Sequence, residues 1–358
     1  MDATTAILFV LGLGLLIGGA EALVRGASGL AARFGIPPLV IGLTVVAYGT
    51  SAPEMAVSVA SALKGQGDLA FGNVVGSNLF NVLFILGLSA TIAPLFVNRQ
   101  LLRLDVPVMI GVAGLGFVLA LDGTIGRLDG VLLLLGAVAY TLLLIRLARR
   151  EPSPPPAAAA RAPQPLAVQV VLIVAGLGAL VLGSRWLVAG AVAVARWLGL
   201  SELVIGLTIV AAGTSLPEVA SSVVAAVRGE REIAVGNVVG SSIFNVLAVL
   251  GLAGAVAPDG VAAAPAALRF DVPVMLAASL ACLPIFFTGG RISRAEGWLL
   301  LGTWLAYTTY LVLDAQGHDA LPAYSAALLY FAAPLVVVTL AVLTFRALGR
   351  GETDVRQP

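Results

Sequence analysis

Residues 41–90 read IGLTVVAYGTSAPEMAVSVASALKGQGDLAFGNVVGSNLFNVLFILGLSA, and residues 205–254 read IGLTIVAAGTSLPEVASSVVAAVRGEREIAVGNVVGSSIFNVLAVLGLAG. At an offset of 164 positions, 30 of these 50 residues are identical, and the matches include acids, hydroxyls and amides. A charged side chain at the centre of a bilayer costs about 3 kcal/mol or more. The matched pair Glu54 and Glu218, set in apolar segments, therefore indicates one shared site for an ion.

The composition is that of a polytopic membrane protein. Of the 358 residues, 59% are hydrophobic and 11% charged, with a mean hydropathy of +1.04, and a soluble chain of this length could not bury so much apolar surface. The single cysteine, Cys282, excludes an intrachain disulfide, and the net charge of +1 gives no indication of nucleic-acid binding. The sequence contains no nucleophile–base set or metal-ligand cluster, so we expect neither an enzyme nor a bound cofactor.

Apolar runs of about 20 residues, the length that crosses a bilayer core, predict eleven transmembrane helices. They lie near 5–26, 38–63, 69–93, 104–121, 128–147, 167–194, 201–227, 233–257, 270–287, 295–314 and 322–347. No A-x-A cleavage site follows the first run, so it is expected to be a retained helix rather than a signal peptide.

A polar, proline-rich stretch, REPSPPPAAAARAPQP at 150–165, divides these runs into two groups of five and one extra. The predicted fold is an all-α polytopic membrane protein with two five-helix repeats, a ten-helix core and a C-terminal eleventh transmembrane helix. Its expected parts are a first repeat (1–147), a cytoplasmic Pro/Ala-rich linker (148–166), a second repeat (167–314), and an extra helix with a cytoplasmic tail (315–358).

An odd number of spans per repeat predicts that the two repeats are inverted relative to each other, as in many secondary transporters. Basic residues support the count, because the cytoplasmic side of a membrane protein carries an excess of them. The side of the linker holds Arg33, Arg99, Arg103, Arg146, Arg149, Arg150, Arg161, Arg228, Arg231, Arg291, Arg294, Arg346, Arg350 and Arg356, and the other side holds Lys64, Arg127, Arg196 and Arg269. This bias predicts an outside N-terminus and a cytoplasmic C-terminus.

The GTSxPE segments carry the chemistry of a cation site. Pro53 lacks an N–H and its ring clashes with the carbonyl of Gly49, and Pro217 repeats this effect in the second half. Thr50 and Ser51 lie four and three residues before Glu54, so the spacing predicts hydroxyls and carboxylate on one helix face. Carbonyl, hydroxyl and carboxylate oxygens are the ligands of hard cations such as calcium.

The second segment, GNVVGSxxFN, predicts a polar stripe on an apolar helix. Asn73, Ser77 and Asn81 recur every four residues, and Asn237, Ser241 and Asn245 repeat them. We expect each stripe to face the GTSxPE segments of both halves. The asparagines could instead be packing contacts between helices. No arginine or lysine lies in the motif spans to neutralise the glutamates, which leaves a proton or a bound cation for that role.

These paired segments resemble the two alpha-repeats of the sodium/calcium exchanger family, within the calcium/cation antiporter superfamily. The resemblance covers residues 5–314. It implies a ten-helix core in which the second, third, seventh and eighth helices enclose the ions, while the first and sixth helices slide to give alternating access.

The resemblance also implies roles for matching residues. Glu54 and Glu218 would be shared ligands of calcium and sodium. Thr50 and Thr214, with the carbonyls of Ala47 and Ala211, would complete the calcium site, and Ser77 and Ser241 would help to form flanking sodium sites. Asn81 and Asn245 would also bind calcium or sodium. Supporting positions are Ser51, Ser215, Asn73, Asn237, Pro53 and Pro217.

Many relatives carry an aspartate where this chain has Asn81 or Asn245. Two carboxylates still balance one calcium ion, and an amide oxygen remains a neutral ligand, but the case for potassium co-transport is weaker. We therefore expect a sodium/calcium antiporter without a bound cofactor, in contact with membrane lipid and located in a prokaryotic plasma (inner) membrane. The alternatives are a proton/calcium antiporter and, in another class, a passive cation channel. The sequence leaves stoichiometry, oligomeric state and the role of the eleventh helix open.

Overall fold

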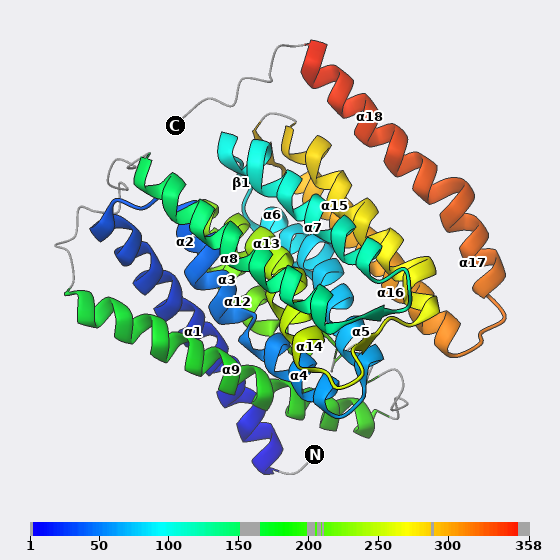
Figure 1. Ribbon diagram of the computed structural model, residues 1–358, viewed down its shortest axis with the longest axis horizontal. Helices are drawn as coiled ribbons and strands as arrows, with labels where there is room; N and C mark the ends of the chain where they lie inside the picture. Colours follow the sequence, from blue (N-terminus) through cyan, green and yellow to red (C-terminus); the bar gives the residue numbers. More distant parts are fainter. Residues whose placement is uncertain are drawn as a thin grey trace.

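A computed structural model of the chain describes residues 3–150, 165–198, 205, 209, 211–287 and 290–349. Apart from four two-residue strands, the regular structure in these ranges is helical (Figure 1). The expected linker falls almost wholly outside the described residues, as do the start of the predicted span 201–227 and the tail from residue 350.

The helices follow the predicted apolar runs closely, and several contain π-helical segments, labelled η. The first half contains α1 (Ala3–Phe34), α2 (Pro38–Ile41), η1 (Gly42–Val46), α3 (Ala47–Thr50), α4 (Ala52–Leu63), α5 (Gly67–Leu79), η2 (Phe80–Ile85), α6 (Leu86–Ile92), η3 (Leu101–Asp105), α7 (Val106–Leu119) and α8 (Arg127–Arg150). The second half contains α9 (Leu166–Trp197), α11 (Ala211–Gly213), α12 (Leu216–Val227), α13 (Arg231–Phe244), η6 (Asn245–Leu250), α14 (Gly251–Val256), η7 (Ala267–Asp271), α15 (Val272–Phe287) and α16 (Arg294–Ala315). The chain continues through α17 (Leu321–Ala327), η8 (Leu328–Ala332) and α18 (Ala333–Gly349).

Eight helices in the described ranges are long and apolar enough to cross a membrane, and a ninth span forms if α2–α3 and α4, joined at a 45° bend, count as one. Eleven spans were expected. The predicted span 201–227 begins outside the described residues and ends in α12. The predicted span 295–314 is α16, which has the required length but carries Trp, Tyr and Thr residues among its aliphatic ones.

The long helices α1 and α9 pack against each other through glycines. A Cβ atom on Gly19 would lie 2.8 Å from the carbonyl oxygen of Gly176, and one on Gly12 would lie 2.9 Å from that of Gly183. Only glycine allows two helix backbones to approach so closely. Figure 1 shows the two helices crossing along one side of the molecule.

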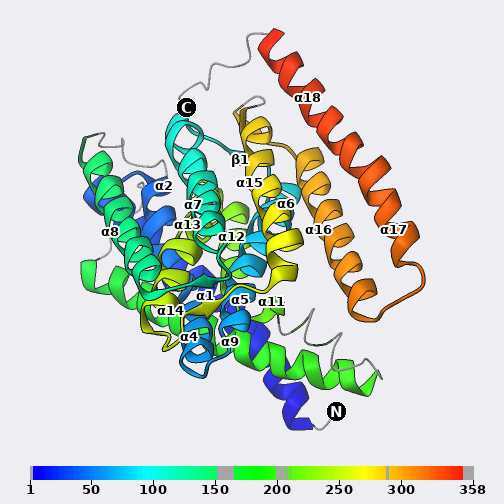
Figure 2. The same ribbon diagram turned by 45° about the vertical axis from the view of Figure 1, so that its right-hand side comes forward.

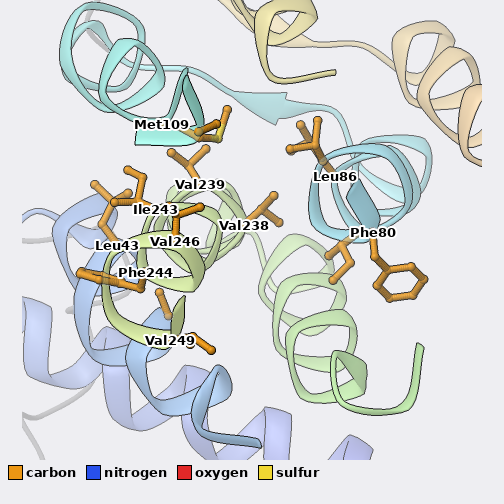
Figure 3. Close-up of a cluster of buried hydrophobic side chains, with 14 of the residues drawn as sticks. Leu43, Phe80, Leu86, Met109, Val238, Val239, Ile243, Phe244, Val246 and Val249 are labelled. Carbon is orange, nitrogen blue, oxygen red and sulfur yellow. The ribbon is translucent and has the colours of Figure 1, made fainter. Parts of the chain in front are cut away.

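The centre of the fold is α13, with η6 and α14 continuing from it. Every residue of the most apolar window in this span is buried inside the protein. The helix is thus buried on all sides, and this burial includes its polar stripe of Asn237, Ser241 and Asn245. Val238, Val239, Ile243 and Phe244 contribute to the buried cluster in Figure 3, where Met109 from α7 packs beside them.

The short strands connect the two halves. β1 (Leu95–Phe96) pairs with β4 (Arg291–Ile292), and β2 (Thr124–Ile125) pairs with β3 (Val261–Ala262), both antiparallel. The connection that follows the third predicted span thus lies beside the one that follows the ninth. Likewise, the connection after the fourth span lies beside the one after the eighth.

The segment from α17 to α18 lies on the outside of the bundle. Figure 2 shows it beside α15 and α16 and away from the centre. Only 6% of its most apolar window is buried inside the protein.

Candidate cation site

Both GTSxPE segments interrupt their helix at the serine. Ser51 separates α3 from α4 with φ −78° and ψ 5°, and Ser215 precedes α12 with φ −90° and ψ 8°. Pro53 and Pro217 lie in the first turn of the helix that follows, where a missing N–H costs little. The π-helical η1 ends just before α3. Such local departures from α-helical geometry are frequent at functional sites.

The two glutamates lie in the interior, with Glu54 and Glu218 each only 1% exposed. Each accepts a hydrogen bond from the serine of the opposite repeat. Ser215 Oγ donates to Glu54 Oε1 at 2.7 Å, and Ser51 Oγ donates to Glu218 Oε1 at 3.1 Å. These crossed bonds bring the two GTSxPE segments together at one place.

The residue spacing predicts that Ser51 lies beside Glu54 of its own helix, whereas in the structure Ser51 bonds Glu218 of the other repeat. The helix break at Ser51 is the physical reason, because residues three apart share a face only in a continuous helix. Ser51 and Ser215 were expected in supporting positions, and the structure makes them direct partners of the carboxylates.

The asparagines of the polar stripes brace the glutamate backbone. Asn73 Nδ2 donates to Ser58 Oγ at 2.9 Å and to the Glu54 carbonyl at 3.3 Å. In the second repeat, Asn237 Nδ2 donates to Ser222 Oγ at 2.8 Å and to the Glu218 carbonyl at 3.4 Å. The repeated pattern holds each glutamate against the third or eighth predicted span of its own half.

The threonines and the next serine complete the surroundings of the glutamates. Thr50 Oγ1 donates to Asn237 Oδ1 at 3.1 Å and lies 3.4 Å from the Ala47 carbonyl, which also accepts from the Ser51 N–H. Ser77 Oγ lies 3.3 Å from Ser215 Oγ. The stripe of the first repeat therefore contacts both halves, through Asn73 and Ser77. Ala211 opens α11, on the second-repeat side.

Several buried polar atoms have no hydrogen-bond partner among the described residues. They include Glu54 Oε2, Glu218 Oε2, Thr214 Oγ1, Ser241 Oγ, Asn245 Oδ1 and both amide atoms of Asn81. All of these residues belong to the two sequence motifs that the repeats share, and all but one of the atoms are oxygens. Because an unsatisfied buried oxygen is costly, this set suits a cation, which needs several oxygen ligands.

Asn78 is a polar residue of the site region that has no identical counterpart in the second repeat. Asn78 is buried, donates from Nδ2 to the Ser242 carbonyl at 3.1 Å and accepts from Asn245 Nδ2 at 3.1 Å. Its counterpart in the second repeat is Ser242, so a search for identical residues passes over it. The only sequence feature that could have indicated a role for Asn78 is its amide, which lies in an apolar helix next to Ser77.

Both repeats match one known protein family. The family model for the sodium/calcium exchanger protein matches residues 4–146 and 168–313, so each match contains one GTSxPE segment. The chain belongs to the sodium/calcium exchanger family. The exchanger is therefore an integral membrane transporter of the calcium/cation antiporter superfamily and not an enzyme.

Individual relatives resemble this exchanger over most of their length. The putative antiporter CaxA of Alkalimonas amylolytica is 42% identical over 87% of the chain and 99% of its own length. The inner membrane protein YrbG of Escherichia coli strain K12 is 39% identical over 87% of the chain and 98% of its own length. A structure of the sodium-calcium exchanger NCX_Mj, soaked with zero sodium and calcium, superimposes with a TM-score of 0.76 at 30% identity. The superposition covers 87% of this chain and 100% of the NCX_Mj chain.

Proposed function

We propose that this antiporter exchanges sodium for calcium and exports calcium at the expense of the sodium gradient. The observation that carries the proposal is the hydrogen bonding of the two buried carboxylates. Glu54 and Glu218 each bind a serine of the opposite repeat through Oε1, and each leaves Oε2 without a partner among the described residues. Two such oxygens, with neutral oxygens beside them, are ligands for a hard cation.

Charge explains why two different ions would compete for this site. One calcium ion or two sodium ions neutralise the pair Glu54 and Glu218. Among the described residues no arginine or lysine takes that role, since the side-chain partners of the two carboxylates are serines. An empty site leaves two buried charges uncompensated, which is strongly unfavourable. The antiporter would therefore change conformation only when loaded, and ions would not leak.

The calcium ligands would be both glutamates, Thr50, Thr214 and the backbone carbonyls of Ala47 and Ala211. Ser77 and Ser241 would contribute to flanking sodium positions, and Asn81 and Asn245 would add neutral amide oxygens. The unpartnered Oγ atoms of Thr214 and Ser241 support this assignment.

Alternating access would use two inverted five-helix repeats, with residues 1–147 and 167–314 as the two halves. The strand pairs support the inversion, because connections after the third and ninth spans lie on one side only if the halves enter the membrane in opposite directions. The glycine-packed pair α1 and α9 would slide as a unit relative to the rest. The arginine distribution supports a cytoplasmic linker and C-terminus, with the N-terminus outside.

Sodium as the coupling ion is supported by the likeness to a solved exchanger whose name states sodium and calcium. The expected location is a prokaryotic inner membrane, which is where the name of the E. coli relative places that protein. A proton-coupled exchange through the same glutamates is the second candidate, and its test is part of the same experiment.

The deciding experiment is calcium-45 uptake into proteoliposomes loaded with sodium. Potassium or choline loading and an imposed pH gradient serve as controls. Uptake that requires internal sodium would support the proposal. Uptake driven by the pH gradient alone would assign the protein to proton coupling, and conductance without exchange would indicate a channel.

Glu54→Gln and Glu218→Gln, tested in the same liposomes, should each abolish exchange. Each removes one of the two charges that balance calcium while keeping the side-chain volume. Exchange that survives in either variant at the wild-type rate would contradict the role of that carboxylate. Correct folding is checked by size-exclusion chromatography of each purified variant.

A further inference from the structure

The two stripe amides at equivalent positions of the repeats are held differently. Asn245 Nδ2 donates to Asn78 Oδ1 at 3.1 Å, and its Oδ1 has no partner among the described residues. At Asn81 neither amide atom has a partner within those residues. Both side chains are 1% exposed. The difference comes from Asn78, because its counterpart, Ser242, bonds the carbonyl of Val238 in its own helix instead.

The direction of the Asn78 hydrogen bonds follows from chemistry. The backbone carbonyl of Ser242 can only accept, so the Asn78 atom that lies 3.1 Å from it must be the Nδ2 donor. The Oδ1 of Asn78 is then the atom directed at Asn245. An oxygen acceptor requires a donor, so Asn245 presents its Nδ2 to Asn78. Its Oδ1, the other terminal atom of the planar amide, is then left for another partner.

Asn245 shares its helix face with Ser241, and both side chains have an oxygen without a partner among the described residues. Ser241 and Asn245 are four residues apart at the junction of α13 and η6, on one side of the helix. The equivalent pair in the first repeat is Ser77 and Asn81, and Ser77 Oγ lies 3.3 Å from the serine that binds Glu54.

We infer that Asn78 is a positioning residue for the transported cation, which holds the Asn245 amide so that its carbonyl oxygen, and not its NH₂ group, is presented to the site. The inference deepens the proposed function and rests on it. The consequence is an asymmetric site. The amide of the second repeat is fixed as an oxygen ligand, whereas the amide of Asn81 can rotate as different ions bind.

The expected effect of losing Asn78 is a weaker calcium site. In Asn78→Ser the hydroxyl is too short to reach both partners, so the Asn245 amide can turn its NH₂ group, a donor that repels cations, towards the ion. Removing a residue that orients a ligand typically weakens metal binding by about tenfold or more. The maximal exchange rate should change little, because the glutamates and their serines are untouched.

The test is a double-mutant cycle on the full-length protein in detergent, read by calcium-45 binding without sodium. The four proteins are wild type, Asn78→Ser, Asn245→Ala and the double variant, with Ser242→Ala as the matched control. Asn78→Ser should raise the calcium Kd about tenfold, and the double variant should bind no more weakly than Asn245→Ala. Ser242→Ala should bind as wild type does.

Two results would overturn the inference. Effects of Asn78→Ser and Asn245→Ala that simply add would show that Asn78 does not act through Asn245. Failure of both Asn78→Ser and the bulkier Asn78→Thr to fold, judged by size-exclusion chromatography and thermal unfolding, would assign Asn78 to packing alone.

Wild-type protein that binds calcium but shows no sodium-driven exchange would contradict the proposed coupling to sodium. The double-mutant cycle on calcium binding would still be interpretable in that case. Wild-type protein that binds no calcium would contradict calcium as the transported ion.

Discussion

The two site serines support their glutamates unequally. Ser215 Oγ bonds Glu54 Oε1 at 2.7 Å and also lies 3.3 Å from Ser77 Oγ, whereas Ser51 Oγ makes a single, longer bond of 3.1 Å to Glu218. Hydrogen bonds to charged groups are worth about 1.5–3 kcal/mol. The first repeat's carboxylate is therefore the more firmly held of the two.

Ser215→Ala should raise the KM for calcium by about tenfold, and Ser51→Ala should raise it less. The measurement is initial calcium-45 uptake into sodium-loaded liposomes over a range of calcium concentrations. Ser279→Ala in α15 is the control, since its hydroxyl bonds only the Met275 carbonyl of its own helix. Equal effects of the two site serines would contradict the asymmetry.

A second pair of acids, Asp105 and Asp271, is bonded to tyrosine hydroxyls rather than to residues of the candidate site. Tyr140 OH donates to the fully buried Asp105 at 2.9 Å, and Gln100 adds a bond at 3.2 Å. In the second repeat, Tyr307 OH donates to the half-buried Asp271 at 2.7 Å. Each bond joins the fourth predicted span of a repeat to the fifth.

Tyr140→Phe should lower the free energy of unfolding by about 1–3 kcal/mol, because it takes a donor from a buried carboxylate. Tyr307→Phe should cost less, since Asp271 is only half-buried. Thermal unfolding of the detergent-solubilised variants measures both effects. Exchange kinetics should stay at the wild-type level in both variants, and a loss of calcium affinity would contradict a purely structural role.

At the scale of elements, the contact between α1 and α9 depends on which face a glycine occupies. A Cβ on Gly19 would lie 2.8 Å from the Gly176 carbonyl oxygen and 2.9 Å from the Leu180 nitrogen. A Cβ on the adjacent Gly18 would meet nothing within 4 Å among the described residues. The two positions are neighbours in one helix, so they share the same helix propensity and differ only in packing.

Gly19→Ala should therefore force α1 and α9 apart and slow exchange, whereas Gly18→Ala should not. The transport rate and thermal stability of the two variants are compared side by side. If α1 and α9 slide together as one unit, Gly19→Ala should lower the maximal rate more than the calcium affinity. Identical behaviour of the two variants would contradict the close packing.

At the scale of the molecule, the exchanger core ends before α17. The family match stops at residue 313, and the segment Leu321–Val342 is almost entirely uncovered by the rest of the protein. Its described contacts include a bond of 3.0 Å from Tyr324 OH to the Ala306 carbonyl. By contrast, α16 places Trp304 against the stacked rings of Phe80 and Phe84.

A variant that ends after residue 315 should retain sodium-driven calcium uptake, because α17 and α18 contribute no residue to the site. A variant that ends after residue 293, and so also lacks α16, should lose it together with its thermal stability. Uptake in proteoliposomes, corrected for the amount of incorporated protein, distinguishes the two. Loss of uptake in the longer variant would assign an essential role to the last helix.

The sequence alone determines the class of the protein and most helix boundaries, and it predicts the candidate residues of the cation site. Apolar run length predicts spans because a bilayer core has a fixed thickness. The internal repeat identifies Glu54, Glu218 and their polar neighbours because a buried charge that is present twice needs a shared reason. These properties depend on residue type and spacing, which can be read along the chain.

Only the tertiary structure decides which residues of the two repeats meet. Helical spacing placed Ser51 beside Glu54, but the break in the helix turns its hydroxyl to Glu218, 167 positions away. Asn78 was missed because its role depends on Asn245 in the opposite repeat, and its own repeat counterpart is a serine. Local spacing describes a continuous helix, whereas these contacts arise where helices break and two halves of the chain pack against each other.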